Sequence, residues 1–98
     1  MARGGRGRPP RPVFEWDAAN EDKLLTHHDV SALEAEQCFS NPHTTRRASR
    51  DVYLLLGRTE SGRMLLLVYQ ERARGVVRVY SGREMTDAER RAYRRSMR

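Results

Sequence analysis

Hydrophobic residues gather in three runs in the second half of the chain, and short turns separate the runs. The runs span residues 52–56, 64–70 and 76–81, and they are rich in the aliphatic, β-branched and aromatic residues that favour strands. Glu60-Ser61-Gly62 and Ala73-Arg74-Gly75 join them and are short enough for hairpin connections. The pattern therefore predicts an antiparallel meander of three strands.

The first half of the chain carries a short strand signal and two helix signals. Residues 13–16 predict a strand, and Asp17 is a suitable N-cap for a helix that runs from residue 18 to about residue 27. Ser31 and Glu34 have the spacing of a capping box, so a second helix is expected to begin there.

Further signals complete an α+β pattern. Asn41-Pro42 ends the second helix, residues 43–50 are expected to form a loop, and Thr86 and Glu89 form a capping box for a C-terminal helix. The predicted order is β-α-α-β-β-β-α, a small antiparallel sheet with two N-terminal helices and one C-terminal helix. The middle strand is apolar on both faces, which predicts that the sheet is covered on both sides. One face would be covered by the N-terminal helices, and the other by the C-terminal helix or by another protein.

Composition adds a strong segregation of charge to this fold. The chain has 98 residues and a net charge of +6, and Lys23 is its single lysine among 19 basic residues. Residues 1–12 carry +4, residues 13–40 carry −6 and residues 41–98 carry +8. If the acidic segment forms helices over one face of a basic sheet, the other face is cationic and suited to a polyanion. Arginine favours phosphate in particular, because its planar fork matches phosphate oxygens.

Residues 1–12 contain Arg, Gly and Pro and nothing to bury, so we expect a disordered basic arm before a domain of residues 13–98. A lone cysteine, Cys38, cannot close an internal disulfide and is expected to be a small helix residue. No apolar run is long enough to span a bilayer, and the basic start lacks the hydrophobic stretch of a secretory signal. The expected location is the cytoplasm, without a membrane partner.

A series of short motifs resembles the BrnT family, the ribonuclease half of bacterial type II toxin–antitoxin pairs, over residues 13 to about 95. The motifs are Phe14-Glu15-Trp16-Asp17, His28-x-Val30, Gly57-Arg58-Thr59, Gly62-Arg63, Tyr69-Gln70-Glu71-Arg72, Arg78-Val79-Tyr80-Ser81-Gly82-Arg83 and Thr86-x-x-Glu89-Arg90-Arg91-x-Tyr93. The resemblance implies a RelE-like microbial ribonuclease fold, RNA cleavage and growth inhibition. It also implies a ribbon-helix-helix antitoxin of the BrnA type, contact with operator DNA through that antitoxin, and a toxin–antitoxin hetero-oligomer.

The chain departs from the family in the first helix. Where the family often has Lys, Asn and Lys-His-Gly, this chain has Asn20, Leu24 and His27-His28-Asp29. A lost lysine removes a candidate base or phosphate contact, and Asp29 replaces a glycine that suits a helix C-terminus.

Metal-independent RNA cleavage needs a base for the 2′-hydroxyl, cations for the charged phosphorane and an acid for the leaving oxygen. His28 is the first candidate for proton transfer, because histidine titrates near neutrality; the alternative is a histidine that ends a helix. Glu71 is a second candidate base or an ion-pair partner of Arg72. Arg58 and Arg83 are candidate catalytic clamps, and the alternative for each is a surface arginine paired with an acid. No cofactor is expected, and His27, His28 and His43 lack the spacing of a zinc site.

Four further residues are candidates for RNA binding, namely Arg63, Arg72, Arg78 and Tyr80. Arg78 and Tyr80 share one face of a strand, so Arg83 reaches that face only if Gly82 bends the strand. If Tyr80 binds RNA, its ring is expected to stack on a base. The alternative is that Tyr80 is a core residue. We expect the guanidinium groups to converge beside the end of the first helix.

Two other functions fit the same sequence. One is a noncatalytic module of this fold that binds RNA or an antitoxin. The other is a small DNA-binding regulator, which the net charge favours and the lack of a recognisable reading helix opposes.

Overall fold

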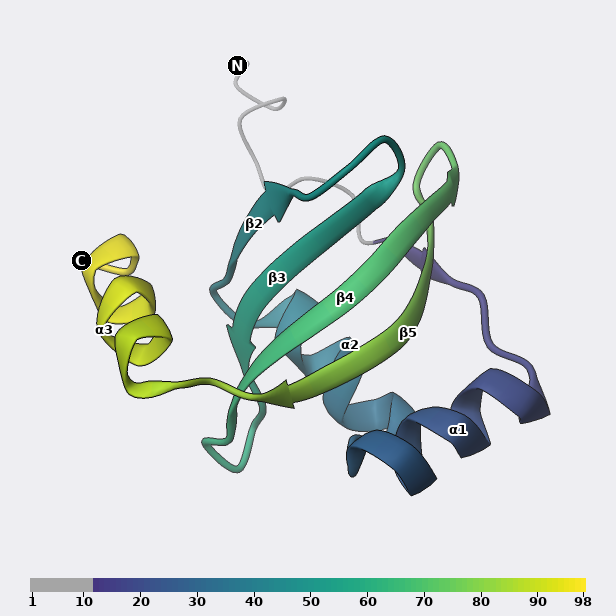
Figure 1. Ribbon diagram of the computed structural model, residues 1–98, viewed down its shortest axis with the longest axis horizontal. Coiled ribbons are helices and arrows are strands. Elements are labelled where there is room, and N and C mark those ends of the chain that lie inside the picture. The colour runs from purple at the N-terminus through teal and green to yellow at the C-terminus, as the bar shows by residue number, and fades with distance from the viewer. Residues whose placement is uncertain (1–11) are drawn as a thin grey trace, which may run out of the picture.

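The computed structural model describes residues 12–98 as a five-stranded sheet with three helices (Figure 1). The strand order is β1-β5-β4-β3-β2. The strands are β1 (Val13–Phe14), β2 (Thr44–Arg47), β3 (Val52–Arg58), β4 (Met64–Ala73) and β5 (Val76–Glu84), and the helices are α1 (Ala18–His28), α2 (Ala32–Ser40) and α3 (Asp87–Ser96). The α+β class and the predicted succession of elements are confirmed, with one additional strand, β2.

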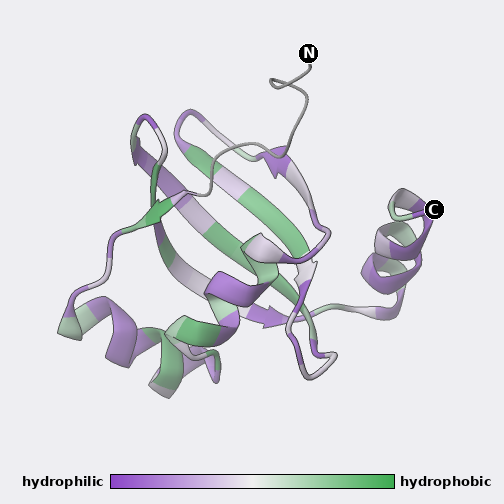
Figure 2. Ribbon diagram, turned by 180° about the vertical axis from the view of Figure 1, so that it is seen from behind, coloured by the Kyte–Doolittle hydropathy of each residue, from purple (hydrophilic) through white to green (hydrophobic). Residues whose placement is uncertain are grey.

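Helices α1 and α2 cover one face of the sheet, which we call the covered face (Figures 1 and 2). Its core includes Leu24 and Cys38 from the helices and Leu55, Leu67 and Val79 from the strands, each at most 1% exposed. Burial raises the pKa of the Cys38 thiol to about 12, so this residue is an inert core side chain, as the sequence predicts.

Three capping boxes fix the helix starts. The boxes predicted from Ser31 with Glu34 and from Thr86 with Glu89 are both present. Asp17 caps α1 as predicted and forms a third box, because the Asn20 side chain accepts from the Asp17 amide.

Helix α3 stands at the β2 edge of the sheet (Figure 1). The Tyr93 hydroxyl donates to the Pro42 carbonyl at 2.7 Å, and this side chain is 4% exposed. The contact joins the C-terminal helix to the segment that precedes β2.

Two predictions about the sheet are wrong. Residues 44–47, predicted to lie in a loop, form β2 and pair antiparallel with β3. Their sequence, Thr-Thr-Arg-Arg, lacks hydrophobic alternation, and pairing with a strongly hydrophobic neighbour decides its conformation. The sheet is also mixed rather than antiparallel, because β1 adds to the free edge of β5 in parallel.

The predicted basic arm comprises residues 1–12. Except for Pro12, it lies outside the residues that the structure describes. Among residues 12–98 no helix is long and apolar enough to cross a membrane.

Candidate nucleic-acid interface

The face of the sheet opposite α1 and α2, which we call the open face, is apolar in its middle. Leu54 and Leu56 of β3 and Leu66 and Val68 of β4 alternate with the core residues and are half-buried. In Figure 1, which views this side, α3 does not cross in front of β3 or β4. The four side chains therefore form an apolar strip without a helix over it.

Four of the eight predicted site residues belong to the open face, namely Arg58, Arg78, Tyr80 and Arg83. Arg83 pairs with Leu66 and Arg78 with Gln70, and directly paired residues project to the same side. Arg58 ends β3 in the same alternating set as the open-face leucines. The basic side chains thus border the apolar strip.

A β-bulge brings Arg83 to this face. Tyr80 has no partner in β4, so it is an extra residue that shifts the alternation of β5. Gly82 consequently faces the core, where a Cβ atom would lie 2.9 Å from the Leu67 Cδ2. The sequence made the position of Arg83 on this face conditional on a bend at Gly82. The strand bends at Tyr80 instead, and Arg83 reaches the same face as Arg78.

Arg78 and Arg72 contact acids near the start of α1. Arg78 lies 3.1 Å from the Asp17 carboxylate and 3.6 Å from Glu15 Oε1, and Arg72 lies 3.7 Å from the same Glu15 oxygen. The Asn20 backbone amide, followed by Arg78, lowers the pKa of Asp17, although desolvation raises it. A phosphate at this position would compete with two carboxylates.

Arg83 is held by Glu89 at the start of α3. Its two terminal nitrogens donate to the two carboxylate oxygens at 2.8 and 2.9 Å. Arg83, together with Thr86, lowers the pKa of Glu89 to about 2, against the effect of desolvation. The Arg83 guanidinium, which is predicted to bind a phosphate, therefore binds a carboxylate in this structure.

Arg58 is exposed and forms no ion pair among residues 12–98. Its backbone carbonyl accepts a hydrogen bond from the Asn41 side chain at 2.7 Å, which ties the end of β3 to the end of α2. Arg58 could therefore bind a phosphate without first losing an acidic partner. Arg83, the other predicted clamp, would have to release Glu89.

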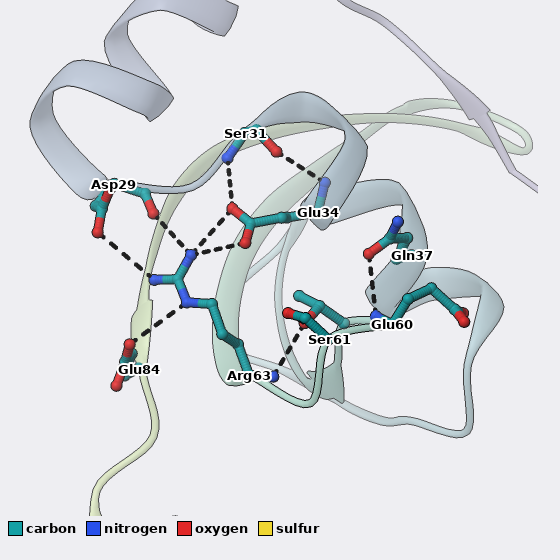
Figure 3. Close-up of polar contacts among 9 residues, drawn as sticks. Asp29, Ser31, Glu34, Gln37, Glu60, Ser61, Arg63 and Glu84 are labelled. Atoms are coloured by element: carbon teal, nitrogen blue, oxygen red, sulfur yellow. Dashed lines mark hydrogen bonds and ion pairs between the residues drawn. The ribbon is translucent and has the colours of Figure 1, made fainter.

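Arg63 lies apart from these residues, on the helix side of the sheet (Figure 3). It contacts Glu34 at 2.9 Å, Glu84 at 3.4 Å and Asp29 at 3.8 Å, and it donates to the Asp29 carbonyl at 3.0 Å. Desolvation raises the pKa of Glu34. The hydrogen bonds from the Ser31 amide and from Arg63 together lower this pKa by more, so the net shift is downward. The arrangement joins α1, α2, β4 and β5.

His28 is the last residue of α1 and is half-buried, with its ring centroid 6.5 Å from that of His27. Asp29 follows in a left-handed conformation, with a φ of 56°. This conformation favours glycine, and the hydrogen bond from Arg63 to the Asp29 carbonyl supports it here.

Glu71 lines a cavity of about 350 Å³ at the opposite end of the sheet. Aromatic rings of Phe39, His43, Tyr53 and Tyr69 contribute to its walls. Tyr53 and Tyr69 pack on the covered face, so the cavity is separated from the open-face arginines by the sheet itself.

The expected convergence beside the end of the first helix is wrong. Arg78 lies beside Asp17 at the start of α1, whereas Arg63 lies beside Asp29 at its end, and the 11-residue helix is about 16 Å long. Sequence alternation could identify the shared face of Arg78 and Tyr80 but could not locate the acids that pair with the arginines.

Two further departures in the first helix, Leu24 and Asn20, have structural roles. Leu24 is fully buried, and Asn20 donates to the Val79 carbonyl at 3.3 Å besides completing the cap of α1. Neither side chain belongs to the open face. Among residues 12–98 no group of three His, Cys, Asp or Glu side chains is arranged to hold a metal ion.

Comparisons with known proteins agree with this architecture. A search of curated proteins finds no match. The crystal structure of the Brucella abortus ribonuclease toxin BrnT, at 1.1 Å resolution, is similar in fold, with a TM-score of 0.59 and 13% identity over 79% of this chain and 97% of that one. The family model described as the ribonuclease toxin BrnT of type II toxin–antitoxin systems matches residues 16–89. The chain therefore belongs to the BrnT family of ribonuclease toxins.

Proposed function

We propose that this toxin cleaves cellular RNA on the open face and inhibits bacterial growth in the cytoplasm when no antitoxin is bound. The main support is that Arg58, Arg78 and Arg83 share this face, whereas α1 and α2, which carry most of the acidic segment, lie on the other. Such polarity orients a polyanion toward one side of the molecule.

Arg58 and Arg83 are the proposed clamps of the scissile phosphate. They lie on the two strands that flank β4, at the end of the sheet where β4 begins, since Arg58 pairs with Met64 and Arg83 with Leu66. A phosphate above the start of β4 would meet a guanidinium from each side. Both cations would then stabilise the charge that develops on the phosphorane.

His28 is the proposed group for proton transfer, and the reaction is expected to need no metal. The contact between Asp29 and Arg63 lies near the start of β4, at the same end of the sheet as Arg58 and Arg83. His28 belongs to α1 on the covered face, so the RNA strand would have to pass that end of the sheet to reach it. Glu71 is less suitable, because it lies toward the far end of β4. Tyr80, 40% exposed at the bulge, is proposed to stack on a base, and Arg72 and Arg78 to contact flanking phosphates.

The apolar strip of the open face is the proposed docking surface for the antitoxin. Half-buried leucines bordered by arginines suit an amphipathic segment that carries acidic residues. We propose a ribbon-helix-helix antitoxin of the BrnA type, which would cover the RNA-binding face, join the toxin in a hetero-oligomer and carry the contact with operator DNA.

Removal of the Arg58 side chain tests the proposal. Purified wild type, Arg58→Ala and Arg74→Ala would be incubated with cellular RNA in a chelator, and cleavage rates measured. Arg74 is the matched control, an exposed arginine in the turn between β4 and β5. Arg58→Ala should be slower by on the order of 100-fold or more, and Arg74→Ala close to wild type. Equal rates for all three proteins would remove Arg58 from the mechanism.

A noncatalytic binding module is the second candidate, and the acid partners of Arg78 and Arg83 favour it. In that case purified wild type would bind RNA and leave it intact in the same assay. Preferential retention of duplex DNA over RNA would instead support a regulator.

A further inference from the structure

Helix α3 presents three arginines on the side that faces away from the domain. Arg91, Arg94 and Arg95 stand at the i, i+3, i+4 spacing that places residues on one side of a helix, and all three are exposed. Tyr93, on the opposite side, is 4% exposed. We call Arg91, Arg94 and Arg95 the arginine stripe; Arg98 follows it beyond the end of the helix.

The stripe has no internal electrostatic partner. Within residues 12–98 none of its three guanidinium groups forms an ion pair, unlike Arg90 of the same helix, which lies 2.9 Å from Asp87. Like charges at i, i+3 and i, i+4 destabilise a helix. Favourable interaction with the helix dipole applies to Arg94 and Arg95 in the last turn but not to Arg91 in the middle.

The helix that carries the stripe is held firmly in place. The Thr86–Glu89 capping box fixes its start, Glu89 also binds Arg83, and Tyr93 donates to the Pro42 carbonyl. Most of the helix is hydrophilic in Figure 2, and it stands at the edge of the sheet next to the open face. A rigid row of cations beside a cationic face extends that face.

We infer that the arginine stripe is a second contact with the RNA phosphate backbone, outside the cleavage site. The inference rests on the proposed function, since RNA bound on the open face would pass α3 as it leaves the sheet past β2. Three arginines over about 6 Å of helix are suited to about two phosphates of one strand.

Salt dependence of RNA binding tests this contact. The probe is a single-stranded RNA with 2′-O-methyl groups, which cannot be cleaved, so binding is measured whether or not the protein is a nuclease. The variant is Arg91→Gln with Arg95→Gln, because glutamine has nearly the helix propensity of arginine. The control is Arg50→Gln with Arg74→Gln, which removes the same charge from two turns at the far end of the sheet.

In a plot of log affinity against log salt concentration, the stripe variant should lose about 1.4 from the magnitude of the slope, at about 0.7 per phosphate contact. The control should keep most of the wild-type slope. In a cleavage assay, the stripe variant should raise the KM of long RNA without changing the rate on a short oligonucleotide that ends before α3. Circular dichroism and the melting temperature check that both variants remain folded.

Three results would overturn the inference. Equal slopes for wild type and the stripe variant would show that the stripe does not contact RNA phosphates. Equal losses in the variant and the control would indicate net charge rather than a site. A change with duplex DNA but none with RNA, or loss of antitoxin binding alone, would assign the stripe to another partner. Absence of RNA cleavage by wild type would contradict the proposed function and leave the binding result standing.

Discussion

The two faces of the sheet are built from the same strands but differ in burial and in their neighbours. On the covered face Leu55, Leu65 and Leu67 are fully buried under two helices, whereas on the open face Leu54 and Leu66 are half-buried and bordered by arginines. Adjacent positions in one strand thus belong to the core on one side and to the proposed binding surface on the other. Leucine side chains on the open face lower the solubility of the isolated chain. Such an apolar surface is expected where a partner protein covers it.

The largest expected effect comes from truncating neighbouring leucines on the two faces. Leu67→Ala should lower the free energy of unfolding by about 2 to 5 kcal/mol, because it leaves a cavity under the helices. Leu66→Ala, on the open face, should cost only about 1 kcal/mol. Urea unfolding measures both. Equal losses would mean that the open face is covered within the isolated chain.

A smaller effect is expected from Gly57 and Arg58, which are neighbours in β3 with opposite faces. A Cβ atom at position 57 would lie 2.9 Å from the Cys38 carbonyl oxygen, so Gly57→Ala would push α2 away from β3. Overpacking of this kind should cost about 1 to 3 kcal/mol. Arg58→Ala should change stability by no more than about 0.5 kcal/mol while it slows RNA cleavage.

Thermal unfolding and the cleavage assay together separate the two roles. If Gly57→Ala proved as stable as wild type, the close approach of α2 to β3 would be wrong. If Arg58→Ala unfolded as readily as Gly57→Ala, its loss of activity would reflect folding rather than catalysis.

This division explains which features the sequence could reveal. Alternation in the hydrophobic strands and the capping boxes of Ser31 and Thr86 depend on nearby residues, so they predicted the three main strands and the helix starts. Strand β2 has no such local signal and exists through its pairing with β3. The parallel addition of β1 to β5 is likewise a long-range contact that no local pattern encodes.

The sequence predicts the type of the candidate site, which stays a prediction, but it does not predict how the arginines are arranged. Arginines near strand ends indicated a phosphate-binding surface, and the alternation of Arg78 with Val79 gave the face. Arg78 forms an ion pair with Asp17, and Arg83 forms one with Glu89. No spacing in the sequence indicates either pair. Only folding determines which arginines remain available, and Arg58 was therefore not distinguishable from the others beforehand.

The smallest expected effect concerns pH and the pair of Arg83 with Glu89. Hydrogen bonds from Arg83, with help from Thr86, lower the pKa of Glu89 from 4.5 to about 2 in the folded protein. A folded-state pKa below the unfolded one gives stability that is fully present above about pH 4.5 and is lost as the pH falls toward 2. Because half of the Arg83 side chain is exposed, the contribution should be about 0.5 to 1 kcal/mol.

Glu89→Gln removes the titrating group and retains a side chain that can complete the capping box. Wild type should be more stable than this variant at neutral pH, and the difference should shrink between about pH 4.5 and pH 2. Urea unfolding at several pH values measures it, and a constant difference would mean that the pair does not form. Because phosphate and Glu89 compete for one guanidinium, the same variant should also bind uncleavable RNA more tightly at neutral pH. Weaker binding would indicate that Glu89 positions Arg83 for RNA instead of competing with it.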